Sequence, residues 1–460
     1  MEDFKIVDNN QIFFVLLFII AVSIAGGFFD NNISMLLLPL IFTLFGIVVT
    51  YILNLEGNIK NSIYIFLLFF GIYLFYNLVV SFGLIHIYGV ENIKSDEEWF
   101  FEASNDIYSK IKNGYNFLEV AGVQEYKDTS GAVYLYGFIS YLAKIYGNNS
   151  FLIQKVGTSF IASLIPMVMY GISRLYFSEK ISIKVAIIYG LLSFIPFFSS
   201  TLLRDTHIAL MFILTMYIIL QRLSFINFLI LLFVSFYSYY LREQTGIFMI
   251  GFTLIYLFVF IHNSIQNIYI EAFIYLSILS IVIILILYSD KLIYMFEQIS
   301  SASSQRSLAQ ASSSSIGAKI AKLPFGLNIL TLFGFGQIQP FPPSLIFTKN
   351  HKGIFELPYL IAGISWFIGW GFLLYGIFKD NILKQLDSKL FFMFLFSILY
   401  ITLISIIEFS QRRQMAVYPI LFLVMVLSYK KMSVTARTKI WVGMIFSYLI
   451  MVLIFYFMKL

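Results

Sequence analysis

The chain has 460 residues, of which 60% are hydrophobic and 12% are charged, against roughly 25% charged residues in an ordinary soluble domain. At a mean hydropathy of +0.88, too little polar surface remains to keep the chain in water. The net charge of +6 is scattered, which excludes the dense basic patch of a nucleic-acid-binding protein. The lack of cysteine excludes disulfides, thiol catalysis and cysteine metal sites.

Long apolar windows recur along the whole chain, at the length an α-helix needs to cross roughly 30 Å of hydrocarbon. They predict an all-α polytopic membrane protein with about 13 transmembrane helices, within a range of roughly 11 to 14, in a single integral membrane domain over residues 1–460. The expected spans are Ile12–Phe29, Ile33–Leu53, Ile63–Ile85, Phe151–Tyr170, Val185–Leu203, Ala209–Leu220, Ile226–Tyr240, Gly246–Ile261, Ile268–Leu287, Leu357–Phe378, Leu390–Ile407, Ala416–Tyr429 and Ile440–Phe457.

Lys and Arg gather on alternate loops, and the positive-inside rule assigns those loops to the cytoplasm. The first span lacks the basic leader and cleavage site of a signal peptide, so we expect it to remain as a helix with a cytoplasmic N-terminus. The basic residues of the predicted cytoplasmic loops are Lys60, Arg174, Lys180, Lys184, Arg222, Lys379, Lys384, Lys389, Lys430, Lys431, Arg437 and Lys439.

This orientation predicts two long extracytoplasmic loops, His86 to Ser150 and Ser289 to Glu356, with short interfacial helices. In the first loop, Gly131 to Tyr146 is apolar on most faces but too short to span, which indicates a helix at the outer leaflet. The second loop contains the low-complexity stretch Ser300 to Ser315, which we expect to be a mobile lid, and then the proline-broken apolar segment Leu323 to Ile346.

Acidic residues precede interfacial aromatic residues in the first loop. Asp96 and Glu97, followed by Glu98, stand directly before Trp99. A partly desolvated carboxylate at membrane level can take a proton from a sugar hydroxyl as a general base. The alternative is that these are solvated loop acids.

Arginines recur at the predicted outer ends of helices. Arg204 is followed by Asp205, Arg242 by Glu243, and the adjacent pair Arg412 and Arg413 follows Glu408 and Gln411. We expect Arg204 and Arg242 each to pair with the acid that follows it and to keep donors free for phosphate. Arginine suits phosphate binding because its planar guanidinium donates to two oxygens. The alternative for Arg204 and Arg242 is that they are interfacial anchors that snorkel to water. For Arg412 and Arg413 it is that they are simply exposed to extracytoplasmic water.

The four histidines lie in different loops without an i, i+4 pair, so a histidine metal site is not expected. His207, close behind Asp205, is a further candidate for phosphate contact, with a plain outer-face histidine as the alternative. The chain has no Walker A sequence and no G-x-G-x-x-G, which excludes nucleotide hydrolysis.

The order of these features resembles the GT-C superfamily of membrane glycosyltransferases and the related bacterial O-antigen and capsule repeat-unit polymerases. The resemblance covers about half the chain. The segments that carry it are SDEEWFFEA (95–103), the stretch GAVYLYG to SRLYF (131–177), LLRDTHIALMFILTMYIILQR (202–222), YLREQTGIF (240–248) and QRRQMAVYPILFL (411–423).

The resemblance implies a polyprenyl-phosphate-linked saccharide donor at the extracytoplasmic face of the bacterial inner membrane, in O-antigen, lipopolysaccharide or capsule assembly. It places Asp96 or Glu97 as base or metal contact, with a divalent ion left open as cofactor. It places Arg204, Arg242 and Arg412 or Arg413 at the lipid phosphate. The chain lacks the His-Pro-Pro segment of single-sugar transferases, which favours a repeat-unit polymerase.

The implied partners are the lipid-linked donor, a lipid- or glycan-linked acceptor, membrane lipids and a chain-length regulator protein, without nucleic acid. The alternative function is a lipid-linked oligosaccharide flippase. Such a transporter needs basic residues lining a mid-membrane cavity, whereas the charges of this sequence gather near predicted helix ends.

Overall fold

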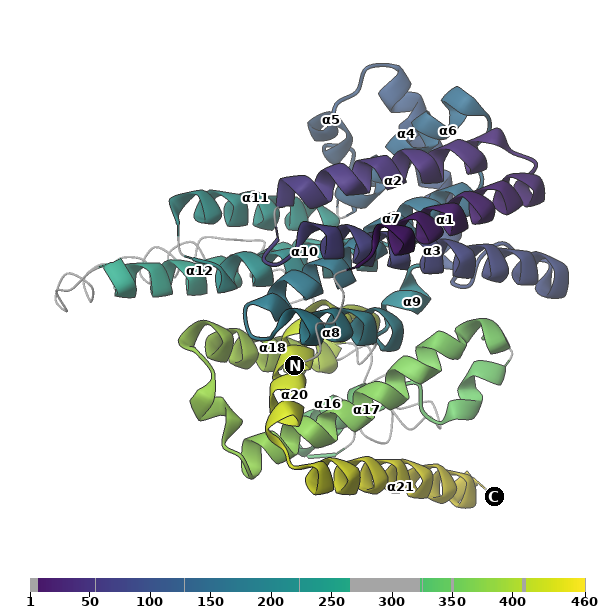
Figure 1. The fold of residues 1–460 in the computed structure, drawn as a ribbon. Coiled ribbons are helices and arrows are strands. Elements are labelled where there is room, and N and C mark those ends of the chain that lie inside the picture. Colours follow the sequence, from purple (N-terminus) through teal and green to yellow (C-terminus); the bar gives the residue numbers. More distant parts are fainter. Residues whose placement is uncertain are drawn as a thin grey trace.

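A computed structural model describes residues 7–53, 55–127, 129–222, 224–264, 323–324, 326–348, 351–407 and 411–459. Within these ranges every regular element is a helix (Figure 1), which confirms the all-α prediction. Three expected features lie outside the described residues: the span Ile268–Leu287, the serine-rich stretch Ser300 to Ser315, and Glu408.

The first part of the chain, purple to teal in Figure 1, forms the upper part of the molecule in that view. Its elements are α1 (Asn9–Asp30), α2 (Ile33–Leu53), α3 (Ile59–Gly83), η1 (Leu84–Tyr88), α4 (Asp96–Lys112), α5 (Phe117–Ala121), α6 (Ser130–Tyr146), α7 (Phe151–Arg174), α8 (Glu179–Leu192), α9 (Ile195–Phe198), α10 (Asp205–Leu220), α11 (Phe225–Leu241) and α12 (Glu243–Ser264).

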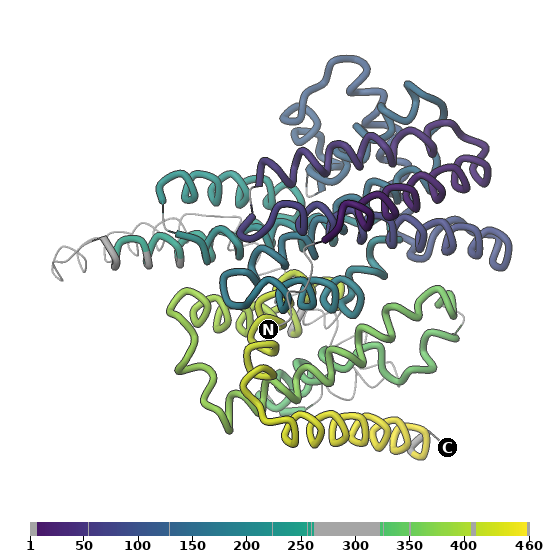
Figure 2. The backbone as a smooth tube through the Cα atoms, in the orientation of Figure 1, coloured from purple at the N-terminus to yellow at the C-terminus, as the bar shows by residue number. Residues whose placement is uncertain are grey.

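The last part, green to yellow, lies below it, and α21 runs along the lower edge (Figure 2). Its elements are α16 (Leu327–Gln337), η2 (Pro343–Phe347), η3 (Gly353–Glu356), α17 (Leu357–Phe378), η4 (Ile382–Gln385), α18 (Ser388–Ile407), α19 (Gln411–Gln414), η5 (Met415–Val417), α20 (Tyr418–Lys431) and α21 (Val434–Lys459).

Seven helices in the described ranges are long and apolar enough to cross a membrane, as expected of a membrane protein. Helices α10 and α11 and the first part of α12 are also apolar but shorter. The predicted number of about 13 spans is therefore not confirmed. The seven are Asn9–Asp30, Ile33–Leu53, Ile59–Tyr88, Phe151–Arg174, Gly353–Phe378, Ser388–Ser405 and Val434–Phe457.

Helix α7 is the centre of the bundle. Of its most apolar window, 94% is buried, against 6% for the peripheral α21. It packs against α2, α3, α6, α8 and α10. Small residues such as Gly157 allow this close packing, since a Cβ there would lie 2.2 Å from Cδ1 of Ile139 on α6.

The predicted span Val185–Leu203 is wrong as a continuous helix. Helix α8 ends at Leu192, and only the single turn of α9 follows before α10. Pro196 explains part of this break, because it lacks the N–H that would donate to the carbonyl of Leu192. Residues 193–204 thus form an irregular, buried segment. Asn77 of α3 holds it through a 3.0 Å hydrogen bond from Nδ2 to the carbonyl of Ser199.

The first long loop folds into α4, α5 and α6, which gather at the top of Figure 1. The expected helix at Gly131 to Tyr146 is present as α6, and it packs on α4, α7 and α11. In the second loop, the proline-broken segment contains α16 and η2. Both predicted long loops thus contain helices in their described parts.

Gly246 allows α12 to approach the end of α11. A Cβ at this position would lie 2.5 Å from the Cα of Tyr239 and 2.8 Å from its backbone nitrogen. These are backbone atoms, so the neighbour cannot rotate away. A single residue, Arg242, lies between the two helices, and its position depends on this contact.

We therefore expect Gly246→Ala to destabilise the protein by about 1–3 kcal/mol through overpacking. The matched control is Gly443→Ala on α21, where an added Cβ meets nothing within 4 Å. Thermal unfolding of the detergent-purified variants measures the difference. Equal unfolding temperatures would contradict the close approach at Gly246.

Candidate functional site

Chain segments far apart in sequence meet at the candidate site, and each contributes a residue from a helix end. The residues are Asp96, the first of α4; Arg204, directly before α10; Asp205, the first of α10; Arg242, between α11 and α12; and Arg412, in α19.

Asp205 is the centre of this group. It is 2% exposed, and each carboxylate oxygen accepts from a different arginine. Arg242 Nη2 lies 3.1 Å from Oδ1, and Arg412 Nε lies 2.5 Å from Oδ2. Arg242 thus pairs with Asp205, the acid that follows Arg204 in the sequence, and not with its own neighbour Glu243. A buried carboxylate requires such pairing, so Asp205 fixes the two guanidinium groups.

Arg412 joins this buried centre to the surface. Its Nη1 donates to Oδ2 of Asp96 at 2.8 Å, and the Asp96 side chain is 53% exposed. Burial disfavours the charged form of Arg412, but Asp205 and Asp96 outweigh burial and raise the pKa of Arg412 above its usual value. One guanidinium therefore bridges a buried and an accessible carboxylate.

The arginines also repel one another. Burial lowers the pKa of Arg204, which lies just outside α10, to about 9. The guanidinium groups of Arg242, Arg412 and Arg413 add to this lowering, and Asp205 opposes it. Arg204 Nη1 donates to the carbonyl of Leu241 at 3.1 Å.

Arg242 is 7% exposed, and its buried Nε has no hydrogen-bond partner among the described residues. A buried donor without a partner is costly. Together with the repulsion at Arg204, this donor suits a site for an anion.

No family model, curated protein or solved structure matches this chain.

Glu97 has quite different surroundings from its neighbour Asp96. It is fully buried, and its Oε1 accepts from the backbone N–H groups of Ile93 and Lys94 at 2.9 and 2.8 Å. Its Oε2 accepts from Leu202 N–H at 3.0 Å and lies 3.5 Å from Lys155 Nζ, which is also buried. Glu97 thus ties the start of α4 to the segment before α10 and positions Asp96 near Asp205.

We expect Lys155→Met to cost about 3–5 kcal/mol of stability, because it leaves the Glu97 carboxylate buried without its cation. Glu97→Gln should also destabilise, and the double variant Glu97→Gln/Lys155→Met should recover part of the loss. The control is Glu98→Gln, which changes an exposed acid one position along. Thermal unfolding that is the same for Glu97→Gln and Glu98→Gln would show that Glu97 has no structural role.

The other three predicted residues make different contacts. Arg413 acts electrostatically on Arg204. Glu243 Oε1 accepts from the hydroxyl of Tyr239 at 3.0 Å. His207 is 2% exposed and packs edge-on against Tyr136, with ring centroids 5.3 Å apart.

A glutamine network positions Arg412 and was not predicted from the sequence. Gln411 Nε2 donates to the carbonyl of Gly336 at 3.1 Å, and Gln337 Nε2 donates to Gln414 Oε1 at 2.6 Å. The pattern of glutamines on both sides of an Arg-Arg pair was the available signal. The network fastens α19 to α16, which belongs to the second long loop.

Among the described residues, no three His, Cys, Asp or Glu side chains come together as metal ligands. The divalent ion that the resemblance leaves open as cofactor therefore stays a prediction.

Proposed function

We propose that this chain is a membrane glycosyltransferase of bacterial cell-surface polysaccharide assembly, with a polyprenyl-phosphate-linked saccharide as donor. The observation that carries the proposal is the arginine cluster around buried Asp205, bridged by Arg412 to the exposed carboxylate of Asp96. A cation cluster and an adjacent accessible base are the two groups that this reaction needs.

The arginines supply the phosphate site. Arg242 has a buried donor without a partner, and the neighbouring guanidinium groups destabilise one another at Arg204. A phosphate would satisfy the donor and relieve the repulsion. Because these groups are fixed before the substrate arrives, they can stabilise the charge that develops on the leaving phosphate.

In the proposed reaction, Asp96 takes the proton from an acceptor hydroxyl, and that oxygen forms a bond to the anomeric carbon of the donor. The bond from this carbon to the phosphate oxygen breaks, and the electron pair leaves with the polyprenyl phosphate. Arg242 and Arg412 hold the departing phosphate. Binding at the end of the bundle aligns acceptor, carbon and leaving group.

Arg412 couples the two halves of this site. It donates to Asp96 through Nη1 and to Asp205 through Nε. When a donor phosphate takes part of its hydrogen-bonding capacity, the Asp96 carboxylate is released toward the acceptor. Donor binding would thus free the Asp96 carboxylate from its ion pair with Arg412.

The proposal includes an extracytoplasmic site in the bacterial inner membrane, a cytoplasmic N-terminus and the addition of whole repeat units. The acceptor is lipid- or glycan-linked, and a chain-length regulator is a proposed partner. The charge distribution over the loops supports this orientation.

Deletion of the gene in its own bacterium tests this function. We expect loss of surface polymer and accumulation of a polyprenyl-linked saccharide in the outer leaflet, where an impermeant oxidant of sugar diols reaches it in intact spheroplasts. Restoration by the wild-type gene is the control. Accumulation in the inner leaflet, reached only after lysis, would instead indicate the flippase.

A further inference from the structure

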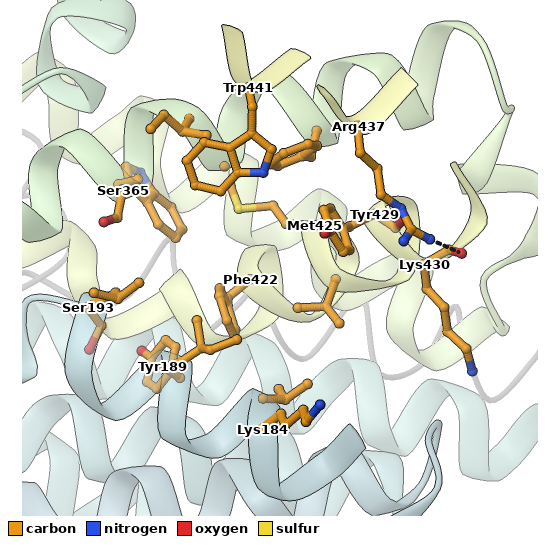
Figure 3. A pocket seen from close by; sticks show the side chains of 18 of the residues that line it. Lys184, Tyr189, Ser193, Ser365, Phe422, Met425, Tyr429, Lys430, Arg437 and Trp441 are labelled. Atoms are coloured by element: carbon orange, nitrogen blue, oxygen red, sulfur yellow. Dashed lines mark hydrogen bonds between the residues drawn. The ribbon is translucent and has the colours of Figure 1, made fainter. Parts of the chain in front are cut away.

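A second, chemically different site lies in the lower part of the molecule. A cavity of about 580 Å³ is lined mainly by residues of α8, α17, α20 and α21 (Figure 3). Its volume is in the range of roughly 300–1,000 Å³ that small ligands occupy. Most of its wall is apolar and aromatic, with Phe372, Phe422, Met425 and Trp441 as large contributors.

Positive charge gathers at one end of this cavity. Lys184, Lys430 and Arg437 line it, and Figure 3 shows them on the side away from Ser193 and Ser365. The lining contains no Asp or Glu. None of the three cations forms an ion pair with a described residue.

Arg437 is held in place by protein contacts that leave its charge unneutralised. Its Nε and Nη2 donate to the carbonyls of Tyr429 and Lys430 at 2.9 and 3.0 Å, and its guanidinium lies 4.4 Å from the ring centroid of Tyr429. Lys184 and Lys430 are exposed. The fixed guanidinium and the two exposed ammonium groups lie at one end of the apolar space.

The basic end is remote from the arginine cluster. Arg412 precedes α20 and Lys430 lies near its other end, and a helix of this length spans about 20 Å. Lys184, Lys430 and Arg437 also belong to the loops that the positive-inside rule assigns to the cytoplasm. The cavity therefore opens at the opposite membrane face from the proposed transfer site.

We propose that this cavity binds an anionic diacyl phospholipid of the cytoplasmic leaflet, with an acyl chain in the apolar space and the phosphate between Lys184, Lys430 and Arg437. The charge of the three cations complements an anionic headgroup, and basic pockets between transmembrane helices on this face suit such lipids. A soluble anion would use the cations but not the apolar wall. The lipid links α8 to α17, α20 and α21, and this role is independent of glycosyl transfer.

The test is thermal unfolding of the delipidated protein in detergent, with added phosphatidylglycerol, phosphatidylcholine or glycerol phosphate. We expect phosphatidylglycerol to raise the unfolding temperature by roughly 5 °C at saturation, and the other two to have little effect. The variant Lys184→Gln/Lys430→Gln/Arg437→Gln should lose at least about half of that rise. The control Lys60→Gln/Lys379→Gln/Lys384→Gln removes the same charge from the same predicted face and should keep it.

A second measurement needs no charge variant. Trp366 and Trp441 line the cavity, so equimolar phosphatidylglycerol with brominated acyl chains should quench wild-type tryptophan fluorescence more than brominated phosphatidylcholine. Equal quenching by the two lipids, equal stabilisation by them, or equal loss in both triple variants would overturn the proposal. Stabilisation by glycerol phosphate alone would also overturn it, because the apolar wall would then have no part.

Discussion

Replacing Asp96 by Asn should lower the rate of glycosyl transfer by about 10²- to 10⁴-fold, the usual contribution of a general base. Asn keeps the size of the side chain but cannot accept the proton of the acceptor hydroxyl. Folding should be unchanged, because Asp96 is half exposed and begins α4 without filling the core. The measurement is polymer formed per amount of protein in the membrane, from a purified lipid-linked donor.

A matched variant is the control for this result. Glu98→Gln removes an exposed acid two residues along and should retain wild-type activity. Wild-type polymer synthesis by Asp96→Asn would show that Asp96 is a solvated loop residue that merely pairs with Arg412.

The second large effect is expected at the arginines. Arg242→Lys and Arg412→Lys keep the positive charge but lose the planar fork that binds two phosphate oxygens. Charge-assisted hydrogen bonds contribute about 1.5–3 kcal/mol each, so each variant should lose roughly 10- to 100-fold in activity. Lipid-linked precursor should accumulate in cells that carry either variant.

Anchoring predicts a different outcome for the same variants. Lysine snorkels to the interface as well as arginine does. If the arginine is only an anchor, Arg→Lys should therefore keep activity and only Arg→Ala should lose it. Arg222→Lys, on the predicted cytoplasmic side, is the control and should remain active. Wild-type polymer in all the Lys variants would show that these arginines are membrane anchors.

Part of the candidate site was predictable from the sequence because charged residues at the end of an apolar run indicate a helix end. In the structure Arg204 directly precedes α10, Arg242 lies between α11 and α12, and Arg412 lies in the short α19. The sequence predicted that each Arg pairs with the acid that follows it, and for Arg242 this was wrong, because Arg242 donates to Asp205. Asp205 binds Arg242 because the packing of the bundle brings the starts of α10 and α12 together. This is a tertiary contact that the local sequence does not indicate.

The distinction between Asp96 and Glu97 also required the structure. Adjacent residues at a helix start point to different sides, and the partners that bury Glu97 include Leu202 and Lys155, which come from other segments. The broken span after Leu192 was missed for a related reason. Hydropathy measures apolar content, and residues 193–204 are mostly buried but contain only the single helical turn of α9.

Direct binding of a radiolabelled polyprenyl phosphate to the purified protein tests the central claim, that the arginine cluster is a lipid phosphate site. We predict saturable binding to the wild type, binding weaker by roughly 10- to 100-fold in Arg242→Lys, and little binding of the unphosphorylated polyprenol. Equal binding of polyprenol and polyprenyl phosphate, or undiminished phosphate binding by Arg242→Lys, would contradict the account.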